Sequence, residues 1–250
     1  MEKTREYGKA GTIGIGVPQA NTTIEAEFRA IVPEGVNVIT ARLQGSRTDS
    51  RRRLLDYFHT LDATLDTFDS APLGAVGFAC TGSSYLLGVD EDRRAFADLS
   101  KRRGYPVVPA TEAILESLAH IGARSVALVS PYPAWLTEAG LKYWRAAGVD
   151  VVEVAQVEAD TSDTRNVYNI TSADAVAAAN RLARRDMGAL LLSGTGMPSL
   201  RAVSELARAF GKPILSSNLC LSWALAKRIG LRAAPPWEQR AKWEALLDRL

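Results

Sequence analysis

The chain has 250 residues, 47% of them hydrophobic and 23% charged, which is enough apolar material for one large core or two smaller lobes. The net charge of +2 and the short basic run RTDSRRR at 47–53 give little support to nucleic-acid binding. The charged start MEKTREYGKA is unlike a signal peptide and no run of about 18 apolar residues occurs, so we expect a cytoplasmic protein without a membrane segment.

Along the chain, short runs rich in valine and isoleucine alternate with segments of helical period, which is the pattern of α/β proteins. Strands are predicted at 12–18, 36–43, 74–82 and 106–110, then at 125–132, 149–157, 188–196 and 213–218. Helices are predicted at 22–31, 56–68, 111–122, 172–185, 198–210, 219–226 and 237–250. Continuous apolar strands of this kind predict mostly parallel sheets that are covered by helices on both faces.

The second set of strands repeats the order and nearly the spacing of the first. Val17-Pro18 corresponds to Ser130-Pro131 at an offset of 113 residues, Gly35-Val36 to Gly148-Val149 at 113, Gly74 to Gly188 at 114, and Pro106 to Pro213 at 107. We interpret this as an internal duplication that gives two pseudo-twofold related, Rossmann-like α/β lobes, each with a four-stranded, mainly parallel sheet. The first lobe is expected to hold residues 10–112 plus 218–250, and the second residues 113–217.

Ligands in such sheets bind beyond the carboxyl ends of the strands, so the turns that follow the strands are the candidate sites. GAVGFACTGSS at 74–84 and GALLLSGTGMP at 188–198 align at an offset of 114, which places Cys80 opposite Gly194. We expect these two turns to face one another across a cleft between the lobes. The active site is predicted in that cleft.

Cys80 is the predicted catalytic residue. It ends a strand and precedes the small residues Thr81 and Gly82, and the positive end of the following helix favours its thiolate. The alternative is that Cys80 is simply a small buried hydrophobic residue. Cys220 lies in an apolar helical segment, where core packing is the expected role, and a disulfide is not expected in a reducing compartment.

The turn at Gly194, Thr195 and Gly196 is typical of an anion-binding loop, because glycines allow backbone N–H groups to converge and Thr195 adds a hydroxyl. The alternative is an ordinary tight turn. Its duplicate at Thr81 and Gly82 favours a substrate with two carboxylates. The sequence has no dinucleotide or P-loop motif and no histidines at metal-ligand spacing, so no cofactor and no metal are expected.

These motifs carry a resemblance to a known family. VPQANTTIEAEF (17–28), ACTGSS (79–84), VSPY (129–132) and LLSGTGMPSL (191–200) resemble the maleate cis-trans isomerase and arylmalonate decarboxylase branch of the aspartate/glutamate racemase superfamily, over residues 11 to about 230. The resemblance implies that Asn21 contacts a substrate carboxylate, that Cys80 is the first-lobe cysteine and that Tyr132 is the tyrosine after the fifth strand. A further asparagine of the isomerases corresponds to Asn166, or alternatively to Asn169.

The resemblance also implies cofactor-independent chemistry on a small dicarboxylate, and a homo-oligomer. The second cysteine of the family falls at Gly194 here, so racemisation by two thiols loses one of its bases. We expect cis-trans isomerisation like that of maleate isomerase, through Cys80. The alternatives are decarboxylation like that of arylmalonate decarboxylase, with stereospecific protonation by Cys80, and a dicarboxylate-binding protein without catalytic activity.

Overall fold

The computed structural model describes residues 6–183, 186–232 and 234–247. Its strands are β1 (Gly11–Pro18), β2 (Val36–Leu43), β3 (Ala75–Phe78), β4 (Val107–Pro109), β5 (Ser125–Ser130), β6 (Asp150–Gln156), β7 (Ala189–Leu192) and β8 (Ile214–Ser216). They form two four-stranded sheets, in the orders β2-β1-β3-β4 and β6-β5-β7-β8. Every pairing is parallel, and the second sheet has the same strand order as the first, with each strand number larger by four. The predicted two-lobed α/β fold is thereby confirmed.

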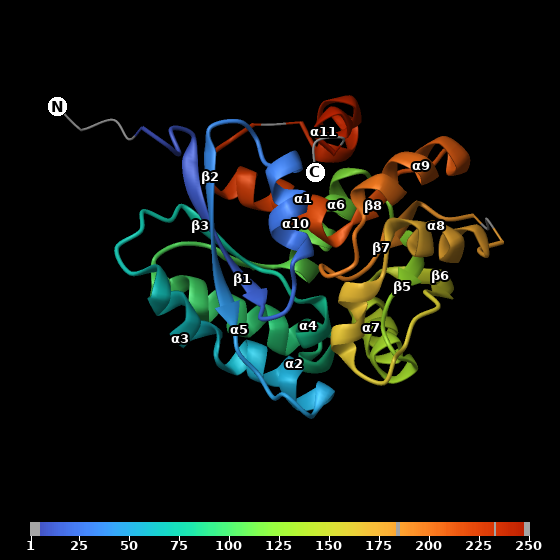
Figure 1. Ribbon diagram of the computed structural model, residues 1–250, viewed down its shortest axis with the longest axis horizontal. Helices are drawn as coiled ribbons and strands as arrows, with labels where there is room; N and C mark the ends of the chain where they lie inside the picture. Colours follow the sequence, from blue (N-terminus) through green and yellow to red (C-terminus); the bar gives the residue numbers. More distant parts are fainter. Residues whose placement is uncertain (1–5, 184–185, 233, 248–250) are drawn as a thin grey trace.

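The helices surround both sheets, and Figure 1 shows the first lobe beside the second, with α11 near the top between them. They are α1 (Thr23–Ile31), α2 (Ser50–His59), α3 (Leu61–Leu65), α4 (Thr81–Leu87), α5 (Val89–Arg103), α6 (Ala110–His120), α7 (Ala134–Ala146), α8 (Ser172–Asn180), α9 (Leu200–Phe210), α10 (Ser217–Arg228) and α11 (Arg240–Leu247). Short 3-10 turns are η1 (Asp66–Phe68), η2 (Thr164–Asn169) and η3 (Pro236–Glu238). No helix of the described segments is long and apolar enough to cross a membrane.

The predicted helix over 56–68 was wrong, because the chain forms α2, α3 and η1 there instead. The Asp49 side chain accepts a hydrogen bond from the backbone N–H of Arg52, so α2 already begins at Ser50. At the other end, the Thr60 hydroxyl bonds the carbonyls of Asp56 and Gln44. A hydroxyl that bonds backward in this way competes with the helical ladder, and the helix is interrupted at this residue.

The C-terminal segment contacts both lobes. Helix α10 packs on α6, β3 and β4, while α11 packs on α1 and α9. The predicted C-terminal helix is found as α11, and residues 248–250 of that prediction lie outside the described residues, as do residues 184 and 185 of the helix predicted over 172–185. The lobe limits given above stay a prediction, which the packing of α10 on the first sheet supports.

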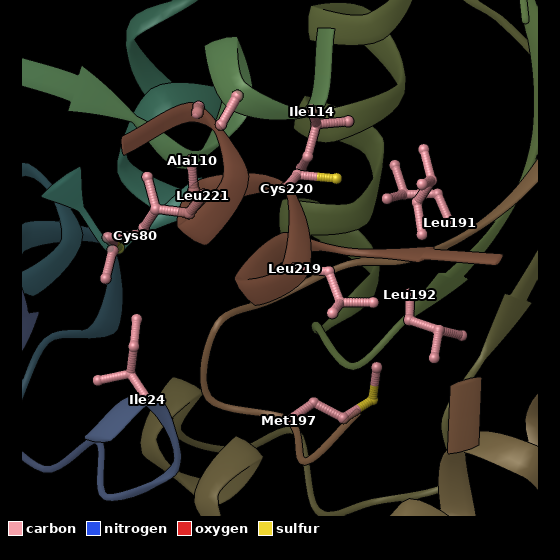
Figure 2. Packing of buried hydrophobic residues seen from close by; sticks show 14 of the residues in the cluster. Ile24, Cys80, Ala110, Ile114, Leu191, Leu192, Met197, Leu219, Cys220 and Leu221 are labelled. Atoms are coloured by element: carbon pink, nitrogen blue, oxygen red, sulfur yellow. The ribbon is translucent and has the colours of Figure 1, made fainter. Parts of the chain in front are cut away.

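Buried apolar side chains of both lobes form one continuous core. Figure 2 shows part of it, with Cys220 beside Ile114. Cys220 is fully buried and is a free thiol, so its predicted place in the core is confirmed. Because the core crosses from one lobe to the other, the two sheets do not form separate hydrophobic units.

Candidate active site

The turns after β3 and β7 meet at the boundary between the lobes. Cys80 and Gly194 each stand two residues beyond the end of their strand. The Thr195 hydroxyl of the second turn donates a hydrogen bond to the carbonyl of Ala79, 2.6 Å away, beside Cys80. The two turns therefore lie together as predicted, while the cleft between them, with the active site in it, stays a prediction.

Tyr132 forms a second link between the turns. Its hydroxyl lies 2.7 Å from the Thr81 hydroxyl, and a Cβ atom built on Gly194 would be 3.1 Å from the same Tyr132 oxygen. Gly194 has a φ angle of +92°, a conformation that side-chain-bearing residues rarely adopt. The missing second cysteine therefore coincides with a backbone position that itself favours glycine.

Cys80 is 5% exposed and stands at the N-cap position of α4. Its Sγ lies 3.1 Å from the Ser83 hydroxyl, which also donates to the carbonyl of Leu54 at 2.6 Å. The backbone N–H groups of Gly82 and Ser83 also act on the sulfur. The small residues after Cys80 therefore contact the thiol itself.

The expectation of a favoured thiolate at Cys80 is not met. Burial raises the pKa of the Cys80 thiol, and this outweighs the hydrogen bonds from Ser83 and Gly82, which act in the opposite direction. Burial removes the water that would stabilise the negative charge, and the few N–H groups nearby do not replace it. Burial of Cys80 therefore disfavours its thiolate.

Asn21 points its amide toward the second-lobe turn. Its Oδ1 accepts hydrogen bonds from the backbone N–H groups of Thr23 and Ile24, and its Nδ2 donates to the Thr195 hydroxyl at 3.4 Å. Asn21 is fully buried, and its carbonyl accepts a bond from Arg42 at 2.6 Å. The start of α1 thus fixes the amide with its Nδ2 toward Thr195, and the contact of Asn21 with a substrate carboxylate stays a prediction.

The second-lobe turn differs from the predicted anion-binding loop. The backbone N–H of Gly194 already donates to the Ser217 hydroxyl at 3.0 Å, and the Thr195 hydroxyl donates to Ala79. The predicted helix at 198–210 begins only at Leu200, four residues after Gly196. The N-terminus of that helix therefore does not add its dipole to the loop at Thr195 and Gly196.

The anion at the start of α9 is a protein side chain, Glu27 of α1. Its carboxylate accepts hydrogen bonds from the backbone N–H groups of Ser199 and Leu200 and from the amide of Asn218. Asn218 also donates to the carbonyl of Thr195 at 3.2 Å. Burial raises the pKa of Glu27, while these hydrogen bonds act to lower it. This network connects the first lobe to the turn of the second.

Sequence reasoning missed Glu27, although the sequence holds a signal for it. Ile24, Glu27, Phe28 and Ile31 recur at the spacing of one helix face, and all four are buried. A carboxylate among apolar residues on the buried face of a helix requires partners inside the protein. That pattern would have predicted a buried polar network beside Asn21.

In the η2 segment, the residue that contacts the second-lobe turn is Tyr168 and not the predicted Asn166. Asn166 is half-buried and lies 3.5 Å from the Ser162 hydroxyl, while Asn169 is exposed. The neighbouring Tyr168 contacts Gly196 so closely that a Cβ atom there would lie 2.5 Å from its ring. The role of Asn166 in binding stays a prediction.

Arg53 of α2 holds η2 against the first lobe. Its side chain is 1% exposed, forms an ion pair with Asp163 and lies 3.1 Å from the Thr164 hydroxyl. Asp163 also pairs with Arg165 at 2.7 Å. Two arginines share one carboxylate, so this border of the site carries one positive charge in excess, which favours an anionic ligand. Nothing in the sequence pattern distinguished Arg53 from the basic run around it.

Among the described residues, no group of three or more His, Cys, Asp or Glu side chains could hold a metal ion. The tyrosines around Cys80 are neutral hydrogen-bonding groups, since burial raises the pKa of Tyr85 to about 12 and that of Tyr132 well above its usual value. The Tyr85 hydroxyl lies 2.8 Å from the Ser193 hydroxyl. The site therefore consists of one thiol, several neutral hydroxyls and an amide, bordered by the cationic group at η2.

The sequence model of the arylmalonate decarboxylase family matches residues 13–240. This chain belongs to the arylmalonate decarboxylase family. The maleate isomerases of Geobacillus stearothermophilus and Alcaligenes faecalis are each 26% identical to it, over 242 and 245 residues. The two matches cover 90% and 91% of this chain, and 94% of each relative. The resemblance stated from the sequence motifs is confirmed.

Solved structures agree with this family assignment. A variant of Nocardia farcinica maleate cis-trans isomerase with a covalently bound succinylcysteine intermediate has a TM-score of 0.78 and 26% identity, over 88% of this chain and 93% of that one. A double mutant of arylmalonate decarboxylase in the liganded form has a TM-score of 0.80 and 20% identity, over 91% and 97% of the two chains. The second likeness supports the fold alone, because the identity is low.

Proposed function

We propose that the protein is a cofactor-independent enzyme that isomerises maleate, or a closely related small diacid, through Cys80. The observation that carries the proposal is the position of this thiol, which is buried at the meeting of the two turns and contacted by Ser83 and by backbone N–H groups. Relatives over nine-tenths of the chain are maleate isomerases, and one of them forms a succinyl adduct on a cysteine. Cys220, the other thiol, is in the core.

The proposed reaction uses one thiol for addition and elimination. The sulfur of Cys80 bonds to one alkene carbon of the diacid, the π bond breaks, and the proton lost by the thiol is carried to the other alkene carbon. The resulting succinyl thioether has a single bond between these carbons, so it can rotate. Elimination of the same sulfur and a proton then gives the trans diacid and regenerates the neutral thiol. Asn21 and Tyr132 are the proposed donors to the carboxylates.

A second candidate, decarboxylation of a malonate, is favoured by the protonation state of Cys80. Because burial raises its pKa, the thiol holds a proton that it can deliver to carbon. Loss of carbon dioxide from one carboxylate would leave an enediolate, and Cys80 would protonate it on one face. Gly194 offers no proton on the other face, so a malonate whose central carbon carries two different substituents would give a product of a single configuration.

The test is turnover of maleate and of phenylmalonate by the purified chain, followed by proton NMR. Cys80→Ala should abolish turnover of the true substrate, since alanine can neither add to a double bond nor deliver a proton. Cys220→Ala is the matched control and should keep the activity. Isomerisation should also yield a protein adduct with the mass of one diacid, which Cys80→Ala lacks.

Two results would contradict the proposal. Full activity of Cys80→Ala would exclude the one-thiol mechanism for both reactions. Binding of diacids by the wild-type chain without turnover of either compound would instead indicate a dicarboxylate-binding protein. The cytoplasmic location and the homo-oligomer also stay proposals, and light scattering of the purified protein would test the second.

A further inference from the structure

Tyr57 of α2 is a buried tyrosine whose hydroxyl is not used by the protein. Its side chain is 2% exposed, and its Oη atom is buried without a hydrogen-bond partner among the described residues. Buried hydroxyls are almost always paired, because an unpaired one loses its bonds to water and gains nothing. The position of Tyr57 in the fold gives a reason for this exception.

The face of α2 that carries Tyr57 borders the candidate active site. Arg53 and Tyr57 are four residues apart and therefore share one side of the helix. Arg53 reaches across to Asp163 and Thr164 of the second lobe. Directly after Arg53 in α2, the carbonyl of Leu54 accepts a hydrogen bond from the Ser83 hydroxyl, which also contacts Cys80. The part of α2 that carries Tyr57 thus contacts η2 of the second lobe through Arg53 and α4 of the first lobe through Leu54.

The pKa shifts of two tyrosines agree with a place for Tyr57 near the candidate active site. Burial raises the pKa of Tyr57, and the nearby Cys80 raises it further. Tyr57 in turn raises the pKa of Tyr168, whose ring contacts Gly196. These effects agree with the packing of α2 on α4, where the side chain of Leu54, three residues before Tyr57, lies against Gly82. As a neutral phenol it can donate a hydrogen bond but cannot act as a base.

We propose that Tyr57 is a substrate-binding residue, whose hydroxyl donates a hydrogen bond to a carboxylate of the diacid bound between the Cys80 and Gly196 turns. This inference rests on the proposed function, because it takes the diacid as the ligand. The Tyr57 hydroxyl has no hydrogen-bond partner among the described residues, and Arg53 and Arg165 share a single carboxylate, Asp163. A substrate carboxylate placed against this face of α2 would accept a hydrogen bond from Tyr57 and balance the second arginine.

The test compares Tyr57→Phe with the wild-type chain by calorimetric titration with maleate and with succinate, and by the KM of the turnover reaction. The variant removes one oxygen atom and keeps the ring. Because a hydrogen bond to a charged group is lost, Kd and KM should rise roughly ten- to a hundredfold. The melting temperature should stay the same or rise, since phenylalanine leaves no unpaired buried hydroxyl.

Tyr143→Phe is the matched control. Tyr143 is also buried, but its hydroxyl donates to the Asp92 carboxylate of α5 at 2.7 Å and so already has a partner inside the protein. Its removal leaves a buried carboxylate with one donor fewer. The melting temperature should therefore fall while Kd and KM stay unchanged. The pair of variants separates a lost ligand contact from a lost structural bond.

The proposal stands only if Tyr57→Phe weakens diacid binding without lowering the melting temperature. Unchanged affinity, or a lower melting temperature, overturns it even where the wild type binds and turns over the diacid. A wild-type chain that binds neither maleate nor succinate overturns this inference together with the proposed function. If Tyr57→Phe does not fold, Tyr57→Leu, which also lacks the hydroxyl, is judged by its diacid affinity alone, because loss of the buried ring itself lowers the melting temperature.

Discussion

Replacement of Gly194 tests why the second turn lacks a thiol. A Cβ atom at this position would lie 2.9 Å from Pro131 Cγ and 3.1 Å from the Tyr132 hydroxyl, and the φ angle of +92° is itself unfavourable for other residues. The backbone conformation should cost about 1–3 kcal/mol, and the crowding about 1–3 kcal/mol more. Gly194→Ala and Gly194→Cys should therefore lower the free energy of unfolding by roughly 2–6 kcal/mol.

Gly148→Ala provides the comparison that separates these two costs. Gly148 has a φ angle of +80°, but nothing lies within 4 Å of a Cβ atom built there. It should carry the backbone cost alone, about 1–3 kcal/mol. The difference between the two alanine variants then measures the crowding against Pro131 and Tyr132.

The assay is thermal and urea unfolding of the three variants beside the wild type. For a chain of this size, each 1 kcal/mol lowers the melting temperature by about 2–4 °C. Gly194→Cys should in addition separate the Tyr132 hydroxyl from Thr81, 2.7 Å away, and so reduce activity even though it restores a thiol. The reasoning is refuted if Gly194→Ala is no less stable than Gly148→Ala. Exchange of the substrate α-proton in deuterated water would show whether the new thiol acts.

Two further predictions follow from the polar contacts. Asn21→Ala should weaken diacid binding by about 1.5–3 kcal/mol, because it removes a donor to a carboxylate. Calorimetric titration measures the loss, and unchanged affinity would place the diacid elsewhere. Folding raises the pKa of Glu27. At pH values between the pKa of the unfolded chain and the raised pKa of the folded one, the folded chain therefore holds a proton that the unfolded chain has lost. The free energy of unfolding should fall as the pH rises through this range. Urea unfolding at a series of pH values measures this pH dependence, and Glu27→Gln should remove it. If the variant keeps the same pH dependence, another group is responsible.

The strand pattern could be predicted because it depends on local apolar runs. The predicted strand at 36–43 matches β2 at both ends, and the repeated spacing correctly indicated two sheets of equal strand order. Helix α5 was not predicted, since its sequence VDEDRRAFADLSKRR is mostly charged and only a few of its side chains are buried. Whether such a segment is helical is decided by what it packs against.

The site was predictable to the extent that it lies directly after strands. The offset of 114 residues was enough to bring Cys80 together with Gly194 and Thr195. Arg53, Tyr57 and Glu27 come from helices, where the orientation of a side chain depends on how the whole helix is placed. The protonation of Cys80 was missed for a related reason, because a motif indicates nearby N–H groups but not the degree of burial that opposes them.

The Glu27 carboxylate limits how the two lobes can move relative to one another. Moving the lobes apart as rigid bodies would pull this carboxylate from the N–H groups of Ser199 and Leu200 and from Asn218, and would expose the shared core. A hinge between the lobes would therefore break the best-connected part of their boundary. The contact between Arg53 and η2 involves fewer residues than the Glu27 network, and its Asp163 side chain is partly exposed. We expect diacids to enter and leave beside η2 while the two sheets keep their relative position.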